Sequence, residues 1–316
     1  DIGHETLVPL DQAAAEQGIG EVHFATLNGA WGAFNGGGSR LYSRYRKSEK
    51  FMAEKDTVTA CLILIGNEIL SGRTQDKNLN FLATGLNEIG IQLREARVIP
   101  DIREKIVATV NECRAEFDYV FTTGGIGPTH DDITSECVAE AFGVKMYRDQ
   151  EIVDLLNSYM KNRGNSEMNE ARMRMATFPE GAVLIKNEVS AAPGYMIGNV
   201  FVMAGVPRIM QGMFEEAKVH LKGGKTVQAR GLVVDLPEGT IAEPLALVQA
   251  RFKEIDIGSY PQMREVGFRV SVVARGTDPD RLDQVIGELV QSLRDIGGNP
   301  EEEDLKTAQS TSHVDD

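Results

Sequence analysis

The sequence has 316 residues, a formal net charge of −14 and a hydrophobic content of 42%. This length predicts about two domains. The acidic composition shows no basic face of the kind that nucleic-acid-binding proteins carry, and no apolar run is long enough to span a membrane. We therefore expect a small-molecule partner, with neither nucleic acid nor membrane involved.

The cysteine usage indicates a reducing compartment. Cys61, Cys113 and Cys137 lie in apolar or helical patterns without paired spacing, which is typical of buried free thiols. No charged segment followed by an apolar run opens the chain, as a secretory signal would. We therefore predict a cytoplasmic protein.

Residues 1–51 show no sustained periodicity. They contain a glycine cluster at residues 36–38 and a basic stretch from Arg40 to Lys50. We predict a poorly ordered extension, and the alternative is a partner-binding arm or a targeting segment. Resistance of this segment to limited proteolysis would contradict the first interpretation.

Strands and helices alternate over residues 52–221. The β-branched and leucine-rich run Val58–Ile65 predicts a buried strand, followed by a glycine-bounded loop at residues 66–72. A helix then begins near Asp76, and further strands are predicted at residues 91–99 and 119–122. This order is typical of a mostly parallel, doubly wound sheet, which binds ligands outside the carboxyl ends of its strands.

Two aspartates stand at predicted helix starts. Asp76 is either an N-cap or a site carboxylate. Asp101 precedes Glu104 with the spacing of a capping box.

A glycine loop follows the strand at residues 119–122. Three glycines and a proline interrupt the strand pattern, and two adjacent carboxylates, Asp131 and Asp132, come just before the next helix. Backbone N–H groups at a helix start suit a phosphate, whereas two carboxylates repel it unless a cation or a proton intervenes. The pattern favours a metal-assisted phosphate or pyrophosphate site. The alternative is a tight turn with positive-φ glycines and aspartate caps.

The later segments complete the first domain and predict a second. Residues 149–163 are amphipathic, and the methionine-rich helical segment at residues 168–175 is typical of core filler. The loop Ala204–Pro207 leads into a helix whose start suits an anion or is only a turn. Residues 222–298 predict a small α+β domain, and the acidic residues 299–316 predict a disordered tail.

Three segments together resemble the molybdopterin-binding (MoaB/Mog-like) family, in the amino-terminal branch of the CinA proteins. They are Gly-Asn-Glu-Ile-Leu-Ser-Gly from residue 66, Thr-Thr-Gly-Gly-Ile-Gly-Pro-Thr-His-Asp-Asp from residue 122, and Ala-Gly-Val-Pro from residue 204. Ala204 stands where the family usually has proline. The resemblance implies a three-layer α/β/α domain in a cytoplasmic protein that is commonly a homo-oligomer.

The resemblance also implies roles for the matching residues. Asp76, Asp131 and Asp132 would be catalytic and would hold a divalent metal (Mg, Mn or Co). His130 would protonate a leaving phosphate, or would be only a surface residue of the loop. The residues expected to bind the ligand are Gly66, Asn67, Glu68, Gly72, Asn78, Thr123, Gly124, Gly125, Gly127, Pro128, Thr129, His130, Thr134, Gly205 and Pro207.

Two enzyme activities are known in this wider family. We expect the first, a metal-dependent nucleotide pyrophosphatase that hydrolyses ADP-ribose or a similar dinucleotide such as FAD to AMP and a phosphorylated product. The alternatives are molybdopterin adenylyltransferase-type activity and non-catalytic binding of molybdopterin or a nucleotide. The pair Asp131-Asp132 and the added α+β segment favour the pyrophosphatase.

Overall fold

The computed structural model describes residues 55–164, 168–262 and 267–305. The predicted extension at residues 1–51 and most of the predicted tail lie outside the described residues. The chain divides into two compact units. The first consists mainly of Thr59–Leu86 and Leu93–Lys222, and the second mainly of the residues after Lys222.

A six-stranded sheet forms the centre of the first unit, in the order β2-β1-β3-β8-β7-β6. Its strands are β1 (Val58–Ile65), β2 (Ile91–Ile99), β3 (Tyr119–Thr123), β6 (Val183–Ile185), β7 (Gly194–Ile197) and β8 (Val200–Met203). β3 pairs in parallel with both β1 and β8, whereas β7 is antiparallel to β8 and to β6. The carboxyl ends of β1, β3 and β8 therefore meet at one edge, where the predicted loops begin.

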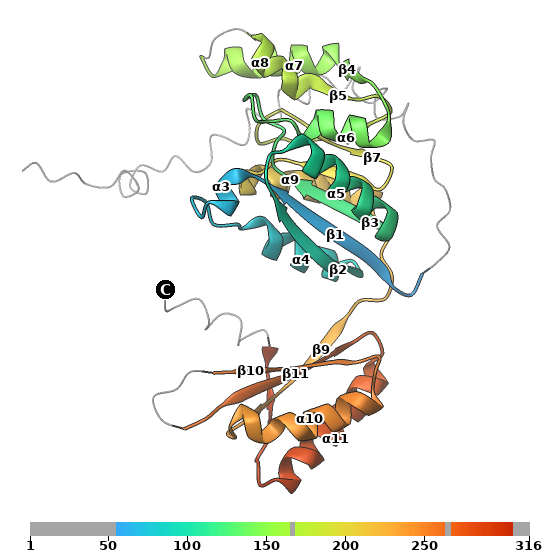
Figure 1. Ribbon diagram of the computed structural model, residues 1–316, viewed down its shortest axis with the longest axis vertical. Coiled ribbons are helices and arrows are strands. Elements are labelled where there is room, and N and C mark those ends of the chain that lie inside the picture. Colours follow the sequence, from blue (N-terminus) through green and yellow to red (C-terminus); the bar gives the residue numbers. More distant parts are fainter. Residues whose placement is uncertain (1–54, 165–167, 263–266, 306–316) are drawn as a thin grey trace, which may run out of the picture. The chain divides into compact units, whose positions relative to one another are not determined.

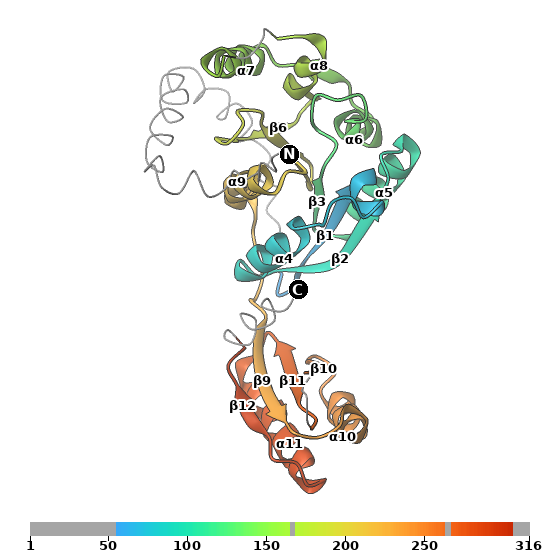
Figure 2. The same cartoon turned by 90° about the vertical axis from the view of Figure 1, so that its left-hand side faces the viewer.

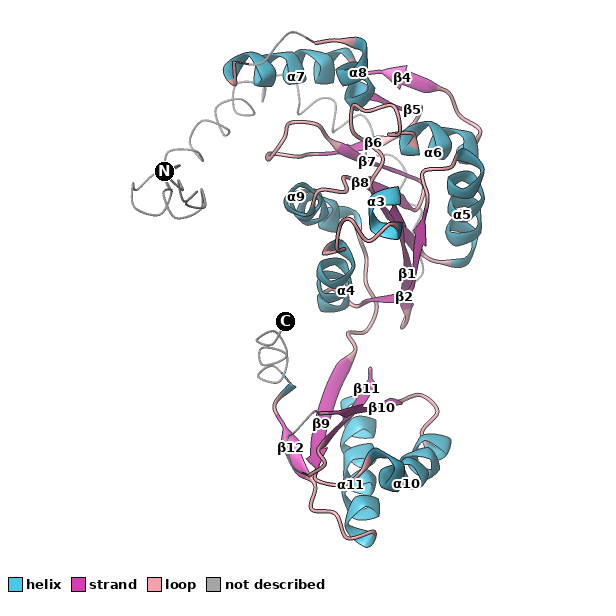
Figure 3. Ribbon diagram, turned by 60° about the vertical axis from the view of Figure 1, so that its left-hand side comes forward, coloured by secondary structure: helices cyan, strands magenta, loops and turns pink. Residues whose placement is uncertain are grey.

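Helices cover both faces of this sheet, so the predicted three-layer architecture is confirmed. Helices α4 (Asn78–Glu88) and α9 (Pro207–Ala217) lie on one face, and α5 (Arg103–Glu116) and α6 (Thr134–Phe142) on the other (Figures 2 and 3). Neighbouring strand residues point to opposite faces. Val120 belongs to the cluster that includes Cys113 of α5 and Cys137 of α6, whereas the ring of Phe121 contacts Phe214 of α9.

A further layer packs beyond α6. It contains α7 (Gln150–Asn162), α8 (Glu170–Met173), the 3₁₀ turn η1 (Arg174–Ala176) and the strands β4 (Met146–Arg148) and β5 (Thr177–Pro179). The two strands pair antiparallel, although each has only three residues and no alternating pattern. Their pairing joins segments about 30 residues apart, so the local sequence did not predict it. A four-residue helix, α3 (Asn67–Leu70), also lies within the first predicted loop.

The second unit is a small α+β layer. Its sheet has the order β10-β11-β9-β12, and α10 and α11 lie beneath the sheet in the view of Figure 1. Leu232 and Val272 of the sheet share one buried cluster with Ile241 of α10 and Leu289 of α11. The bounds are β9 (Gln228–Val234), α10 (Glu238–Arg251), β10 (Asp256–Pro261), β11 (Val270–Gly276), α11 (Pro279–Asp295) and β12 (Glu301–Glu303).

The prediction that residues 299–316 are a disordered tail is wrong for β12. Glu301–Glu303 pairs antiparallel with β9, and Glu302 lies opposite Leu232. Pairing with β9 satisfies backbone hydrogen-bonding groups of this strand even though its side chains are acidic. Charged side chains are common on edge strands because they discourage further pairing.

The cysteines are buried and free, as predicted. No helix in the described part of the chain combines the length and apolar character needed to cross a membrane.

Candidate functional site

The loops after β1, β3 and β8 meet at Gly124. The Gly124 N–H donates to the carbonyl of Met203, the last residue of β8, at 3.1 Å. A Cβ atom at Gly124 would lie 2.1 Å from the carbonyl oxygen of Ile65, the last residue of β1, and one at Gly205 would lie 3.3 Å from Gly124 Cα. The three loops therefore approach so closely that they form one surface, and only a residue without a side chain fits at Gly124.

The first loop is held by Asp101, a residue that we predicted to cap the helix after β2. Asp101 Oδ2 accepts a hydrogen bond from the Asn67 N–H at 2.9 Å, and the Thr74 N–H donates to the Glu68 carbonyl at 3.0 Å. The predicted capping box is wrong, because α5 begins after Ile102 without a side-chain cap. Gly72 has a φ of 72°, which turns the chain after α3.

Asp76 is an N-cap, one of its two predicted interpretations. Its carboxylate oxygens accept hydrogen bonds from the N–H groups of Asn78 at 3.1 Å and Leu79 at 3.0 Å. Asn78 is buried, and its amide nitrogen donates to the Gly205 carbonyl at 2.9 Å. Asn78 therefore joins the first and third loops, and its ligand contact stays a prediction.

The three glycines of the central loop serve different needs. Gly124 and Gly125 have φ angles of 105° and 67°, values that side chains disfavour. Gly127 instead allows the close approach of Asp132, because a Cβ there would lie 2.6 Å from Asp132 Oδ2. Thr134 is fully buried, and its hydroxyl donates to the Gly124 carbonyl at 3.0 Å. It therefore closes the loop rather than lining a ligand surface.

Asp132 holds the turn before α6 instead of capping that helix. Its Oδ2 accepts from the Thr129 N–H at 2.8 Å and from the Thr129 hydroxyl at 2.5 Å. The N-cap of α6 is Ile133, which makes no side-chain cap bond. The interpretation of the aspartates as helix caps is thus wrong for α6. The N–H of Thr134, the first residue of α6, donates to the Gly125 carbonyl at 3.0 Å. No side chain caps the N–H groups of the next two residues, Ser135 and Glu136, which are therefore placed to meet an anion.

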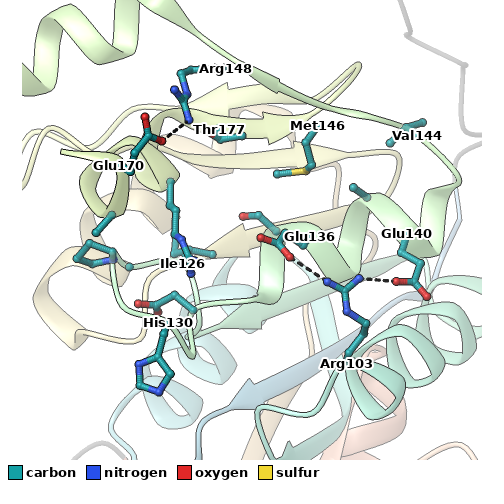
Figure 4. Close-up of a pocket in the computed structure, with 17 residues that line it drawn as sticks. Arg103, Ile126, His130, Glu136, Glu140, Val144, Met146, Arg148, Glu170 and Thr177 are labelled. Atoms are coloured by element: carbon teal, nitrogen blue, oxygen red, sulfur yellow. Dashed lines mark hydrogen bonds and ion pairs between the residues drawn. The ribbon is translucent and has the colours of Figure 1, made fainter. Parts of the chain in front are cut away.

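The other two polar residues of the loop are exposed. The His130 side chain is 96% exposed, its Nδ1 lies 3.9 Å from Asp131 Oδ1, and Figure 4 shows its ring directed away from the other labelled residues. This favours the surface interpretation of His130. The proximity of the polar Thr129 side chain, and next Asp131's own backbone N–H, lowers the pKa of the Asp131 carboxyl below its ordinary value.

A pocket of about 740 Å³ opens on the α6 side of the glycine loop. The loop contributes Gly127, Pro128, His130 and Asp132 to its lining, and α6 contributes Ser135 and Glu136. The predicted residues of the first and third loops do not line it.

Three arginines of this pocket were not predicted from the sequence. Arg103, Arg148 and Arg174 line it from α5, β4 and η1. Arg174 lies in the segment that we predicted to be methionine-rich core filler. The alternation of arginine with methionine in this segment was the available signal that one side of it is polar.

The predicted metal ligands do not form a ready-made cluster. Within the described ranges, no group of three or more His, Cys, Asp or Glu side chains is placed to hold a metal ion. Mg²⁺ is commonly bound by one or two carboxylates together with phosphates and water, so Asp132 fits as a single ligand beside a bound phosphate. The metal roles of Asp76, Asp131 and Asp132 stay predictions.

Comparison with known proteins identifies the family. Residues 61–223 match the model of the family described as "Probable molybdopterin binding domain", which is more than half of the chain. The chain belongs to this molybdopterin-binding family. Residues 226–300 match a second model, "FAD synthase, middle domain".

Individual relatives agree with a MoaB/Mog-like protein of the CinA type. A "CinA-like protein" of Desulfosudis oleivorans is 33% identical over 74% of this chain and 58% of its own length. A "Probable FAD synthase" of Caenorhabditis briggsae is 29% identical over 76% of this chain and 50% of its own length. The crystal structure of the protein CinA "with unknown function" from Thermoplasma acidophilum matches 52% of this chain over 99% of its own length, with 30% identity and a TM-score of 0.48.

Proposed function

We propose that this protein is a metal-dependent nucleotide pyrophosphatase that hydrolyses ADP-ribose or a similar dinucleotide, such as FAD, to AMP and a second phosphomonoester. The observation that carries this proposal is the uncapped start of α6, which opens into the same pocket as Asp132. A helix N-terminus attracts a phosphoryl group. A carboxylate beside that group suits a cation or an attacking water.

Hydrolysis of a pyrophosphate breaks one of its bridging P–O bonds. The oxygen of a water molecule bonds to one phosphorus, the bridging oxygen leaves with the other, and the water's protons are released or shared with the products. In the described part of the chain Asp132 Oδ1 has no hydrogen-bond partner, whereas Oδ2 is held by Thr129. We assign Oδ1 to orienting the water or a cation. A divalent cation would offset the charge that develops on the leaving phosphate.

Two of the similarities described above support a nucleotide substrate. One relative is named a probable FAD synthase, and residues 226–300 match the FAD synthase middle domain. A dinucleotide such as FAD contains the pyrophosphate that the proposed chemistry requires.

One alternative is adenylyl transfer to molybdopterin, which the description of the family matched by residues 61–223 favours. A second is binding without catalysis, which the lack of a preformed metal cluster among the described residues favours. Strong thermal stabilisation by a nucleotide or pterin without turnover would support binding alone.

The deciding assay is AMP release from ADP-ribose, FAD and NAD, each with Mg²⁺, Mn²⁺ or Co²⁺ and without metal. We expect AMP only with metal. We expect Asp132→Asn to lower the rate by about 100-fold or more, because it removes the charge that orients water or cation. Asp154→Asn, an exposed carboxylate of α7 outside the pocket lining, serves as the control.

Absence of AMP under every condition would refute the pyrophosphatase proposal. The next assay would then supply ATP with molybdopterin. Equal rates for Asp132→Asn and the wild type would refute the role of Asp132 even if AMP is formed.

A further inference from the structure

The three arginines of the pocket differ in their partners. Arg103 binds Glu136 at 2.9 Å and Glu140 at 2.7 Å, so one guanidinium bridges two carboxylates of α6. Figure 4 shows this bridge on one side of the pocket and the pair of Arg148 with Glu170, at 3.1 Å, on another. The charges of Arg103 and Arg148 are therefore already balanced.

Arg174 has no carboxylate partner within the described residues. Its one hydrogen bond there runs from Nη1 to the carbonyl oxygen of Thr129, at 2.9 Å. A guanidinium has five N–H donors, so four remain for other acceptors. The residue is exposed to solvent at the pocket lining, and no carboxylate in the described part of the chain forms an ion pair with it.

Thr129 connects this arginine to the proposed centre of the chemistry. Its carbonyl accepts from Arg174, while its N–H and hydroxyl donate to Asp132. Thr129 thus holds the Arg174 guanidinium and the Asp132 carboxylate at the same pocket. This arrangement suits a ligand with two linked anionic groups, one reached by Arg174 and the other by a cation on Asp132 or by the start of α6.

We propose that Arg174 is a specificity-determining residue that binds one phosphoryl group of the pyrophosphate and so favours pyrophosphate diesters over monophosphates. This inference rests on the proposed function. The planar guanidinium matches two phosphate oxygens at once, which a lysine ammonium does not. AMP offers one phosphoryl group, which the start of α6 binds, so Arg174 contributes little to its affinity.

The test measures binding of AMP and of the α,β-methylene analogue of ADP-ribose, each with Mg²⁺, by isothermal titration calorimetry on the full chain. The analogue cannot be hydrolysed at its bridge and stands for ADP-ribose in the binding outcomes below. We expect Arg174→Gln to weaken ADP-ribose binding by about 10- to 100-fold, the effect of losing a charge-assisted pair, and AMP binding by less than about threefold. Arg174→Lys should restore part of the loss because it keeps the charge.

Arg148→Gln is the matched control, because it removes one positive charge from the same pocket but leaves Arg174 in place. Far-ultraviolet circular dichroism and thermal melting establish that each variant is folded. Equal losses of ADP-ribose binding in Arg148→Gln and Arg174→Gln would mean that only the overall charge matters, which overturns the proposal.

Two further outcomes decide between this inference and the proposed function. If Arg174→Gln weakens AMP and ADP-ribose equally, Arg174 acts only by holding the glycine loop through Thr129, and the inference is wrong. Wild-type protein that binds the analogue but releases no AMP from ADP-ribose with any of the metals would refute hydrolysis and leave the comparison for Arg174 valid. No binding of ADP-ribose by the wild type would overturn both.

Discussion

At the scale of single residues, Gly124 is a position where both the backbone conformation and the surrounding space exclude a side chain. It combines a φ of 105° with a space in which a Cβ would lie 2.1 Å from a backbone oxygen. We expect Gly124→Ala to lower the free energy of unfolding by at least about 2 kcal/mol, because both strain and a clash oppose it. Urea denaturation measures the loss.

Gly143 is the matched control, since its φ is 65° but a Cβ atom added there would have no atom of another residue within 4 Å beyond its chain neighbours. Gly143→Ala should cost about 1 kcal/mol, the strain alone. Equal costs at the two glycines would contradict the close approach of β1 to the glycine loop.

Asp118 links the starts of β1 and β3 and makes stability depend on pH. Burial alone would raise its pKa, but hydrogen bonds from Lys55 and Thr59 outweigh this and lower the pKa below its ordinary value. Because the folded-state pKa lies below the unfolded one, the contribution is present above about pH 4 and is lost as pH falls through the folded-state value.

We expect Asp118→Asn to destabilise the protein by about 1–2 kcal/mol at pH 7, since bonds to a charged group are lost. The difference between wild type and variant should shrink as the pH falls from about 7 to about 3. Urea denaturation across this range measures it, and a difference that does not change with pH would show that the charge of Asp118 is unimportant.

At the scale of secondary structure, helices α6 and α7 begin differently. Asp149 caps α7 by accepting from the N–H groups of Glu151 at 3.0 Å and Ile152 at 3.2 Å, whereas α6 has no side-chain cap. The capped helix supports the fold, and the uncapped one faces the pocket. An uncapped helix start at a pocket leaves backbone N–H groups that suit a phosphate.

We expect Asp149→Ala to lower the free energy of unfolding by about 1 kcal/mol, the usual contribution of an N-cap. Asp154→Ala, on the exposed side of the same helix, should change it by less than about 0.5 kcal/mol. Chemical denaturation compares the two variants, and similar losses would show that Asp149 does not act as a cap.

At the scale of the whole molecule, the two units have separate cores. Leu289 is fully buried among the apolar residues of the second unit, while the pocket is lined only by residues of the first. We expect Leu289→Ala to lower the stability of the second unit by about 2–5 kcal/mol and to leave nucleotide binding at low temperature unchanged.

Differential scanning calorimetry with and without ADP-ribose tests this expectation. The ligand should raise the melting temperature of the first unit in both proteins by the same amount. A loss of ADP-ribose affinity in Leu289→Ala would show that the second unit contributes to the site.

The homo-oligomer stays a prediction, and its test is the oligomeric state of the protein in solution.

The sequence by itself determined the strands β1, β2 and β3, the helices α4 and α5 and the glycine loop. Long apolar runs, helical spacing and glycines at chain reversals are local signals, and the local backbone follows them. The same signals predicted the second unit but not β12, because its three glutamates carry no apolar pattern and the strand exists only through its pairing with β9.

Only the tertiary structure decided which polar residues meet. Asp101 holds the first loop instead of capping α5, and Arg174 reaches a carbonyl 45 residues earlier in the chain. Such contacts depend on where the sheet places distant segments, and the hydrophobic periodicity of the sequence does not indicate them. The sequence therefore predicted the glycine loop with Gly124 and Asp132. It did not predict the pocket beside this loop, or that Arg174 in its lining has no carboxylate partner among the described residues.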